Sequence, residues 1–197
     1  PVDHIAVSEH SRQKILLNLS DKDICVRISP ATFFQAHQRL NRDLTRYVLD
    51  KTRQYEYVAD LFAGAGNFSL PIAAEGRKVL AVESDQDALQ AIEESSRESG
   101  LSYLTARRFD ICRNDVLQAL ESYCPQAAIL DPPRSGGGKN LITLDRIASL
   151  NRLVWISCDV VNTCRDLRPF LDKGWKISEI ALFDMFPQTW HMEVVIV

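Results

Sequence analysis

The sequence predicts an α/β fold in which a mostly parallel sheet is finished by an antiparallel pair of strands. From Tyr57 onward, short apolar runs alternate with amphipathic stretches, as they do in a series of βαβ units. A glycine-rich turn follows the first of these runs, and a loop that contains Pro187 joins the last two. The 197 residues fit one such domain with its own hydrophobic core.

Ahead of this series the sequence predicts one strand and one helix. Val26-Arg27-Ile28 has the β-branched residues of a strand, and residues 37–51 form the predicted helix. Residues 1–23 carry no motif, so we treat residues 1–25 as a lead-in of unknown role and residues 26–197 as the domain. Because the chain begins at Pro1 rather than at methionine, we expect a processed chain or part of a longer protein.

Within the series, helices and strands alternate in the order expected of βαβ units. The clearest helix covers residues 85–99, where apolar residues recur at helical spacing and Gly100 provides a C-terminal stop. The other predicted helices cover residues 68–75, 112–123, 141–150 and 161–171. The predicted strands cover residues 57–62, 78–83, 103–109, 127–130 and 153–157, and the closing antiparallel hairpin covers residues 175–183 and 192–197.

Composition and charge exclude several classes of protein. No apolar run approaches the length of a membrane span, and the N-terminus lacks a signal-peptide pattern. The five cysteines include no C-x-x-C pair, which argues against a zinc ribbon or a disulfide framework and favours a reducing cytoplasm. The four histidines show no metal-ligand spacing, so we expect no metal. A net charge of −3 indicates that, if the partner is a nucleic acid, part of the grip on it lies elsewhere.

The glycine-rich turn is the candidate cofactor site. Asp60-Leu61-Phe62-Ala63-Gly64-Ala65-Gly66-Asn67 reads as a strand that runs into a tight turn and then a helix. Glu83, Asp110 and Asp131 fall at the ends of the following strands, where parallel sheets bind ligands. Ser69 occupies the position of the third glycine of a dinucleotide fingerprint, so S-adenosylmethionine fits better than NAD. The alternative is a tight turn that binds no ligand.

Asp131-Pro132-Pro133-Arg134 marks the end of the fourth predicted strand of the series. The two prolines restrict the backbone and fix the direction of Asp131. In many amino-group methyltransferases a related motif ends in an aromatic residue that stacks on the target base, and Arg134 argues against that chemistry. The alternative is a rigid strand exit with Arg134 in a surface ion pair.

Cys158 follows the next strand, and Glu193 lies at the start of the last one. Because strand ends gather at one edge of such a sheet, this pair suggests a nucleophilic cysteine and a carboxylate base that act on one substrate. The alternative for Cys158 is a small buried apolar residue, the commoner role of a cysteine at a strand end. The other cysteines, Cys25, Cys112, Cys124 and Cys164, are interpreted as structural.

With these motifs in place, the chain resembles the RNA 5-methyluracil methyltransferases, which use S-adenosylmethionine to methylate uridine in transfer or ribosomal RNA. The resemblance runs from residue 26 to the C-terminus, and the motif around Glu193 is its most specific part. The matching motifs are, in family order, Phe33-Phe34-Gln35, Asp60-Leu61-Phe62 with Gly64-Ala65-Gly66-Asn67-Phe68, Asp131-Pro132-Pro133-Arg134, Ser157-Cys158, Arg165-Asp166, and Phe183-Asp184-Met185-Phe186-Pro187-Gln188-Thr189 with His191 and Glu193.

The resemblance implies a Rossmann-like S-adenosylmethionine methyltransferase fold, with residues 26–197 as the catalytic domain. It implies Cys158 as the nucleophile and Glu193 as the general base. The target uridine leaves its stack to reach them, and Phe33 or Phe34 stacks on it or belongs to the core. His191 is expected to support the loop that carries Glu193. The implied cofactor contacts are Gln35, Phe62, Asn67, Glu83, Asp110 and Asp131.

The chain departs from the family pattern at three positions. Val160 replaces a proline that stiffens the loop after Cys158, His37 replaces a frequent asparagine, and Ala63 replaces a cysteine. Family members typically carry a small N-terminal RNA-binding barrel, and some an iron–sulfur cluster on four cysteines, and neither fits within residues 1–23. We therefore expect this chain to bind RNA poorly alone and to need an RNA-binding domain that it lacks.

Two other functions remain open. A 5-methylcytosine RNA methyltransferase also uses a cysteine, although that family places its cysteines in different motifs. A non-catalytic methyltransferase-fold module that binds RNA or protein is the alternative from another class, and the altered loop after Cys158 favours it.

Overall fold

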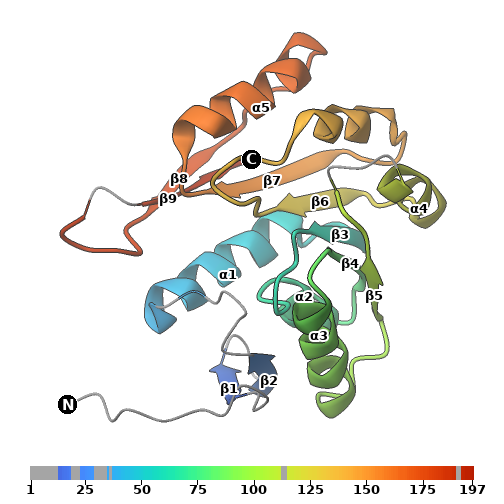
Figure 1. Ribbon diagram of the computed structural model, residues 1–197, viewed down its shortest axis with the longest axis vertical. Coiled ribbons are helices and arrows are strands. Elements are labelled where there is room, and N and C mark those ends of the chain that lie inside the picture. Colours follow the sequence, from blue (N-terminus) through green and yellow to red (C-terminus); the bar gives the residue numbers. More distant parts are fainter. Residues whose placement is uncertain (1–12, 19–22, 29–34, 36, 112–114, 190–191) are drawn as a thin grey trace.

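The computed structural model describes residues 13–18, 23–28, 35, 37–111, 115–189 and 192–197. Within these residues a seven-stranded sheet has the strand order β5-β4-β3-β6-β7-β9-β8 (Figure 1). The strands are β3 (Tyr57–Leu61), β4 (Lys78–Glu83), β5 (Leu104–Arg108), β6 (Ala127–Leu130), β7 (Arg152–Ser157), β8 (Ile180–Phe183) and β9 (Glu193–Ile196).

The pairing of these strands confirms the predicted fold class. β3 to β7 pair only in parallel with one another, whereas β9 pairs antiparallel with both β7 and β8. The sheet is therefore mostly parallel and ends in an antiparallel hairpin. β6 is buried at every position, as expected for a strand that helices cover on both faces.

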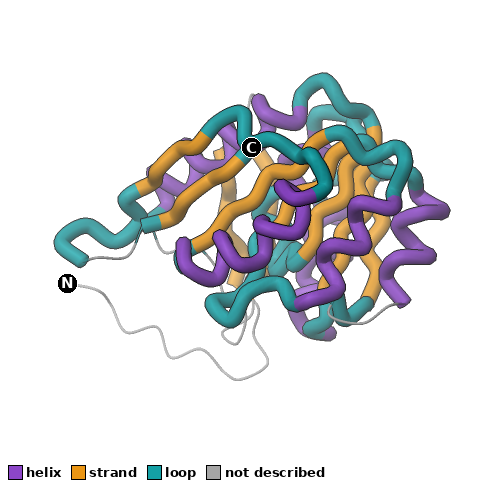
Figure 2. Tube along the Cα trace, turned by 90° about the horizontal axis from the view of Figure 1, so that it is seen from above, coloured by secondary structure: helices purple, strands orange, loops and turns teal. Residues whose placement is uncertain are grey.

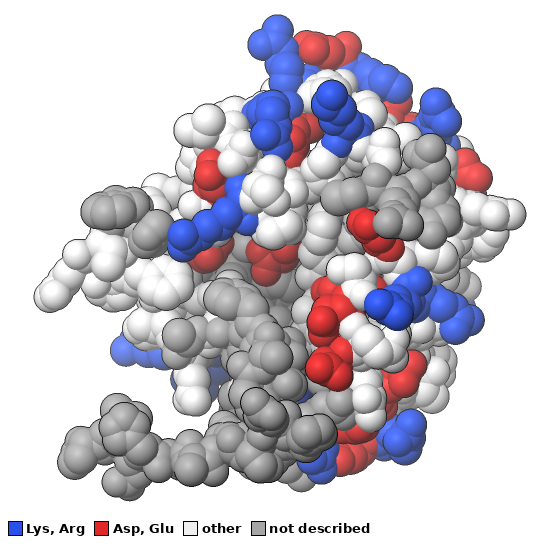
Figure 3. Space-filling view, viewed as in Figure 1, with Lys and Arg blue, Asp and Glu red and all other residues white. Residues whose placement is uncertain are grey.

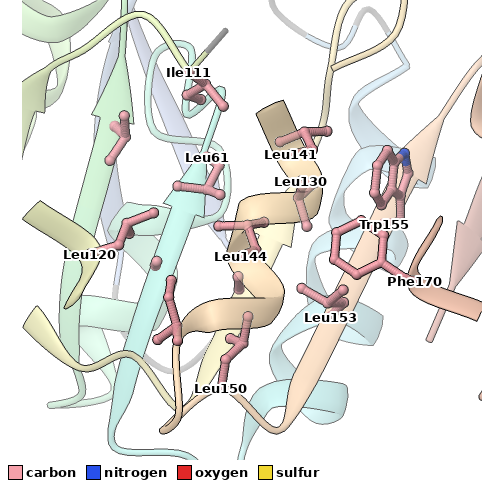
Figure 4. Packing of buried hydrophobic residues seen from close by; sticks show 14 of the residues in the cluster. Leu61, Ile111, Leu120, Leu130, Leu141, Leu144, Leu150, Leu153, Trp155 and Phe170 are labelled. Carbon is pink, nitrogen blue, oxygen red and sulfur yellow. The ribbon is translucent and has the colours of Figure 1, made fainter. Parts of the chain in front are cut away.

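Helices flank the sheet and supply its two cores (Figure 2). They are α1 (Gln38–Thr52), α2 (Ser69–Ala74), α3 (Gln86–Glu98), α4 (Asp115–Tyr123) and α5 (Val160–Asp172), with the 3-10 helix η1 (Lys139–Arg146). Successive residues of β7 alternate between the cores: Trp155 belongs to the core with α4, η1 and α5, and Val154 to the core with α1 and α2. Figure 4 shows the first of these cores, where Trp155 meets Phe170 of α5 edge to face with ring centroids 6.3 Å apart.

The ends of α1 and α3 explain why these helices begin where they do. Asp85 caps α3 by accepting a hydrogen bond of 2.8 Å from the backbone N–H of Ala88. His37 caps α1 in the same way, because its Nδ1 accepts a bond of 3.2 Å from the N–H of Leu40. His37 thus does locally what an asparagine does at a helix start, so this departure from the family pattern leaves α1 intact.

Two elements differ from the sequence prediction. The helix predicted over residues 141–150 is the 3-10 helix η1, which starts earlier and ends at Arg146. Leu141, Leu144, Ile147 and Leu150 are all buried and recur every three residues, which is the period of a 3-10 helix and not of an α-helix. The closing strand predicted from residue 175 begins only at Ile180, since Trp175 packs edge to face on Phe170 with ring centroids 6.0 Å apart.

A strand near the N-terminus was not predicted. β1 (Gln13–Asn18) pairs antiparallel with β2 (Asp23–Ile28), which contains the predicted residues 26–28. Ile24 and Val26 of β2 are buried against Ala65 and Leu70, so the hairpin is attached beside α2 and α3 (Figure 1). The apolar run of β1 is only three residues long, too short for periodicity to distinguish a strand from a loop.

Candidate functional site

The strand ends bring most of the predicted site residues to one edge of the sheet. Glu83 is the last residue of β4, and Phe62, Asp131 and Cys158 directly follow β3, β6 and β7. β9 runs in the opposite direction, so its first residue, Glu193, lies at the same edge. On the face seen in Figure 3, acidic side chains lie near the middle, with lysine and arginine side chains around them.

Cys158 and Glu193 face each other across neighbouring strands. The β7–β9 register pairs Trp155 with Ile196 and Ser157 with Val194, and continuing it by one residue places Cys158 opposite Glu193. Side chains directly opposite in an antiparallel pair have Cβ atoms about 5 Å apart and point to the same face. Glu193 is only 5% exposed and Cys158 is half-buried, so their interaction is poorly screened by water.

Three influences set the ionisation of this pair. Burial raises the pKa of the Cys158 thiol, the Glu193 carboxylate raises it further, and a hydrogen bond with the Arg134 guanidinium lowers it, with a net rise. Burial also raises the pKa of Glu193, against the opposing effect of Arg134. Arg134 therefore lies close to both groups, although its side chain is exposed.

Asp131 lies close to Glu193, and Asp60 lies close to Asp131. The pKa of Asp131 is well above its ordinary value, first because of burial and then because of Glu193 and Asp60. Asp60 is fully buried in β3, and burial raises its pKa to about 7 although Ser69 donates a hydrogen bond to it. These raised pKa values favour the protonated carboxyl groups, which reduces the charge repulsion between neighbours.

The loop from Arg134 to Gly137 is held by α5. Asn162 donates a hydrogen bond of 2.8 Å to the carbonyl of Arg134, and Arg165 donates one of 3.0 Å to that of Ser135. Asp166 accepts a bond of 2.8 Å from the N–H of Gly137 and forms an ion pair with Arg165. These bonds fix the start of α5 and the backbone that carries Arg134 relative to each other.

Gly136 is required for this close approach. Its φ is +88°, a conformation that residues with a side chain rarely adopt, and a Cβ there would collide with Arg165 and Asp166. Asp159 also accepts a bond of 2.9 Å from the N–H of Asn162 and so caps α5 directly after Cys158. The loop after the thiol is thus fastened at several points although it lacks the proline of the family.

The glycine-rich turn lies over Glu83. The N–H of Gly64 donates a bond of 2.8 Å to one carboxylate oxygen of Glu83, and the N–H groups of Ser84 and Asp85 donate to the other. Phe62 has a φ of +63°, unusual for a bulky residue and commonly seen at functional sites. The turn, the strand end and the carboxylate therefore form one rigid unit.

The remaining predicted cofactor contacts differ in their surroundings. Gln35 is 5% exposed, and its Oε1 has no hydrogen-bond partner within the described ranges. Asn67 is occupied by a reciprocal amide pair with Asn41, with bonds of 2.8 and 2.9 Å. Asp110 is exposed beyond the end of β5. The structure thus brings Glu83, Asp131, Cys158 and Glu193 into one region, whereas Asn67 makes a bond within the protein.

Sequence reasoning missed two members of the site. Asp60 belongs to the motif of the glycine-rich turn, and its signal is a carboxylate in the middle of an apolar strand, which predicts a special role. Asn41 carries no sequence signal, because its partner Asn67 lies 26 positions away. Phe33, Phe34, Cys112 and His191 lie outside the described residues. Of the other cysteines, Cys25 is buried and Cys124 and Cys164 are exposed.

Searches of the described ranges found neither a metal site nor a membrane span. No three His, Cys, Asp or Glu side chains there are grouped as metal ligands. None of the helices described is both long and apolar enough to cross a membrane. A hollow of about 70 Å³ lies between α5 and the C-terminal end of β9. It is too small for a nucleoside, and it lies away from the edge of the sheet that carries Cys158 and Glu193.

Comparison with known proteins adds an independent observation. The family model of tRNA (uracil-5-)-methyltransferase matches residues 4–197. The chain is 31% identical over 175 residues to 23S rRNA (uracil(1939)-C(5))-methyltransferase RlmD of Shewanella sediminis, covering 88% of this chain and 39% of the relative. It is 33% identical over 174 residues to an RNA methyltransferase of Thermotoga maritima whose name describes it as uncharacterized, covering 86% of this chain and 38% of the relative. This chain therefore spans about two fifths of the length of these relatives.

The fold is also similar to solved structures. The crystal structure of Pyrococcus abyssi tRNA (uracil-54, C5)-methyltransferase in complex with S-adenosyl-L-homocysteine matches with a TM-score of 0.79 and 24% sequence identity. The match covers 94% of this chain and 43% of that one. At this identity the likeness supports the fold.

Proposed function

Because the chain belongs to the tRNA (uracil-5-)-methyltransferase family, we propose that it transfers a methyl group from S-adenosylmethionine to carbon 5 of a uridine in transfer or ribosomal RNA, through a covalent adduct with Cys158. The observation that carries this proposal is the position of Cys158 opposite Glu193, with Arg134 and Asp131 beside them. A nucleophile and a base that act on adjacent atoms of one ring need such a separation.

The residues around the glycine-rich turn fit a nucleoside cofactor. Among the described residues, the Oε2 atom of Glu83 accepts a bond only from the Gly64 N–H and so keeps an acceptor position for a ribose hydroxyl group, whereas Oε1 already accepts from the N–H and hydroxyl groups of Ser84 and from the N–H of Asp85. Gly64 has a φ of +54° and open space where a Cβ would stand, which lets the backbone approach a ligand closely. The buried Oε1 of Gln35 has no described partner and is available to a ligand donor. When bound, S-adenosylmethionine supplies the methyl group as part of a sulfonium.

The chemistry of uracil explains the need for a thiol. Carbon 5 is too weak a nucleophile to take a methyl group directly, but a thiolate that adds to carbon 6 turns carbon 5 into an enolate-like nucleophile. Cys158 suits this role because a small fraction of a cysteine is thiolate near neutral pH and the sulfur is intrinsically nucleophilic. Arg134 stabilises that thiolate, in opposition to burial and to Glu193.

Glu193 completes the reaction. Once carbon 5 carries the methyl group, its remaining proton passes to the Glu193 carboxylate, the carbon 5–carbon 6 double bond re-forms, and the bond from carbon 6 to sulfur breaks to release Cys158 as thiolate. Burial raises the pKa of Glu193 and so keeps its carboxylate basic enough to accept that proton. The product leaves as 5-methyluridine in RNA.

The direct test combines two variants with base analysis. RNA is incubated with the chain and labelled S-adenosylmethionine, and the methylated nucleoside is identified by mass spectrometry. We expect 5-methyluridine from the wild type, none from Cys158→Ala, and an SDS-stable protein–RNA adduct that accumulates with Glu193→Gln. Full transfer by Cys158→Ala contradicts the covalent route, and 5-methylcytidine assigns the chain to the cytosine enzymes.

The cofactor part can be tested without RNA. Calorimetric titration with S-adenosylhomocysteine should give binding in the wild type that Glu83→Ala removes, while Glu93→Ala, which removes an exposed carboxylate on α3, retains it. Absence of binding by the well-folded wild-type chain contradicts the cofactor assignment and favours a non-catalytic module.

A further inference from the structure

Helix α1 carries four arginines along one side. Arg39, Arg42, Arg46 and Arg53 follow one another at steps of three, four and seven residues, and Arg53 still has helical backbone angles. At about 100° per residue these positions fall within an arc of about 60°, and they extend about 21 Å along the helix axis. We name these four residues the α1 arginine stripe.

The stripe is available to a partner. Arg39, Arg46 and Arg53 are exposed and Arg42 is half-buried. Asp43 and Asp50 lie at positions from which they could pair with the stripe, but in the described part of the chain no carboxylate is within ion-pair distance of its guanidinium groups. The basic residue on another side of α1, Lys51, is by contrast paired with Glu179 at 2.7 Å. The stripe therefore keeps its hydrogen-bond donors free of internal partners.

The stripe starts beside the proposed reaction site. Asn41, in the first turn of α1, is bonded to Asn67 of the glycine-rich turn. Leu44 packs in the same core as Met185, which lies in the segment that leads to Glu193. The N-terminal end of α1 is thus attached to both halves of the site, and the later arginines lie further along the helix. Figure 1 shows the course of α1.

The charge of the stripe selects its partner. Residues 38–53 contain five basic and two acidic side chains, whereas the whole chain has a net charge of −3. Arginine binds phosphate through two parallel N–H···O bonds, so a row of free guanidinium groups fits a row of phosphates. An extended polyanion matches this geometry better than a single small anion does.

We propose that the α1 arginine stripe holds the phosphate backbone of the substrate RNA on the strand segment that flanks the target uridine. This inference rests on the proposed function, and it locates a part of the RNA grip on the catalytic domain itself. With three or four phosphate contacts, the grip is weak and depends steeply on salt.

The test compares two variants with the same change of charge. Arg39→Gln/Arg42→Gln/Arg46→Gln removes three charges from the stripe, and Arg97→Gln/Arg107→Gln/Arg146→Gln removes three exposed arginines from other elements. Binding of the full 197-residue chain to a fluorescein-labelled, uridine-rich single-stranded RNA is followed by fluorescence anisotropy at several salt concentrations. Circular dichroism and S-adenosylhomocysteine binding establish that both variants are folded.

We expect the stripe variant to bind at least about tenfold more weakly at low salt, and its plot of log affinity against log salt to lose about 2 in slope, since each phosphate contact to a single strand contributes about 0.7. The control variant should keep most of the wild-type slope. Equal slopes for the stripe variant and the control overturn the proposal. A methyl-transfer assay on the same proteins separates the two hypotheses. If the wild type binds RNA through the stripe but transfers no methyl group, only the proposed function is contradicted. If the stripe variant is active and binds RNA as tightly as the wild type does, only the proposal for the stripe is contradicted.

Discussion

Replacing Glu193 by glutamine should make the Cys158 thiol ionise more readily. The carboxylate lies opposite the thiol in the β7–β9 register, and its charge raises the pKa of Cys158. Two unit charges about 5 Å apart interact by about 3 kcal/mol at an effective dielectric constant of about 20. That energy corresponds to about a hundredfold change in the thiolate population of Cys158. Because water on the exposed side of Cys158 reduces the effect, we expect the thiolate population to rise by between about tenfold and a hundredfold.

The assay is the rate of alkylation of Cys158 by iodoacetamide, because only the thiolate reacts. At a pH of about 8, below the ordinary range of a thiol, the rate reports the thiolate fraction. Peptide mass spectrometry separates Cys158 from the other four cysteines. The expected result is faster alkylation in Glu193→Gln, and slower alkylation in Arg134→Gln, since the guanidinium lowers the pKa of the thiol.

The control is Glu93→Gln, which removes an exposed carboxylate on α3 and should leave the rate unchanged. Equal rates in the wild type and Glu193→Gln would mean that the two groups do not interact electrostatically. The pairing of Cys158 with Glu193 would then lose its main support, whatever the family resemblance.

Three further predictions concern stability and cofactor binding. Gly136→Ala should lower the free energy of unfolding by about 3 kcal/mol in urea titrations, because φ is +88° and a Cβ collides with side chains of α5. The control Gly76→Ala, where φ is +86° but the space around it is open, should lower it by about 1 kcal/mol. Burial raises the pKa of Asp60 to about 7, against 3.8 for an ordinary aspartate, so between these pH values the folded chain binds more protons than the unfolded chain and loses stability as pH rises. Asp60→Asn should reduce that loss, and an unchanged dependence of stability on pH contradicts the assignment. Asn41→Ala leaves the Asn67 amide without its partner and should lower the free energy of unfolding by about 1–3 kcal/mol. It should also weaken the binding of S-adenosylhomocysteine in calorimetric titrations, and an unaltered dissociation constant would disprove this prediction.

Much of the fold could be predicted because hydrophobic patterning decides it. β4 and β6 have the predicted bounds because each is built on an apolar run, and α3 lies between its cap Asp85 and Gly100, whose φ is +64°. The 3-10 helix η1 could not be predicted in the same way, because an apolar period of three resembles an α-helical period over so short a segment.

The candidate site was predictable to the extent that strand ends determine it. Glu83, Asp131, Cys158 and Glu193 meet because the fold gathers the carboxyl ends of parallel strands. The environment of Asp60 and the position of Arg134 beside the thiol depend instead on how deeply each group is buried and on bonds between distant segments. The sequence carries no local pattern for either quantity.

Because β9 lies between β7 and β8, the last strand of the described chain fills a gap in the interior of the sheet. β8 precedes β9 in the sequence, but among the described strands it pairs only with β9. It therefore belongs to the sheet only through β9. β9 also contributes Glu193, and β7 leads into Cys158. The insertion of β9 between β7 and β8 therefore does two things at once: it joins β8 to the sheet and sets the Glu193 carboxylate opposite the thiol.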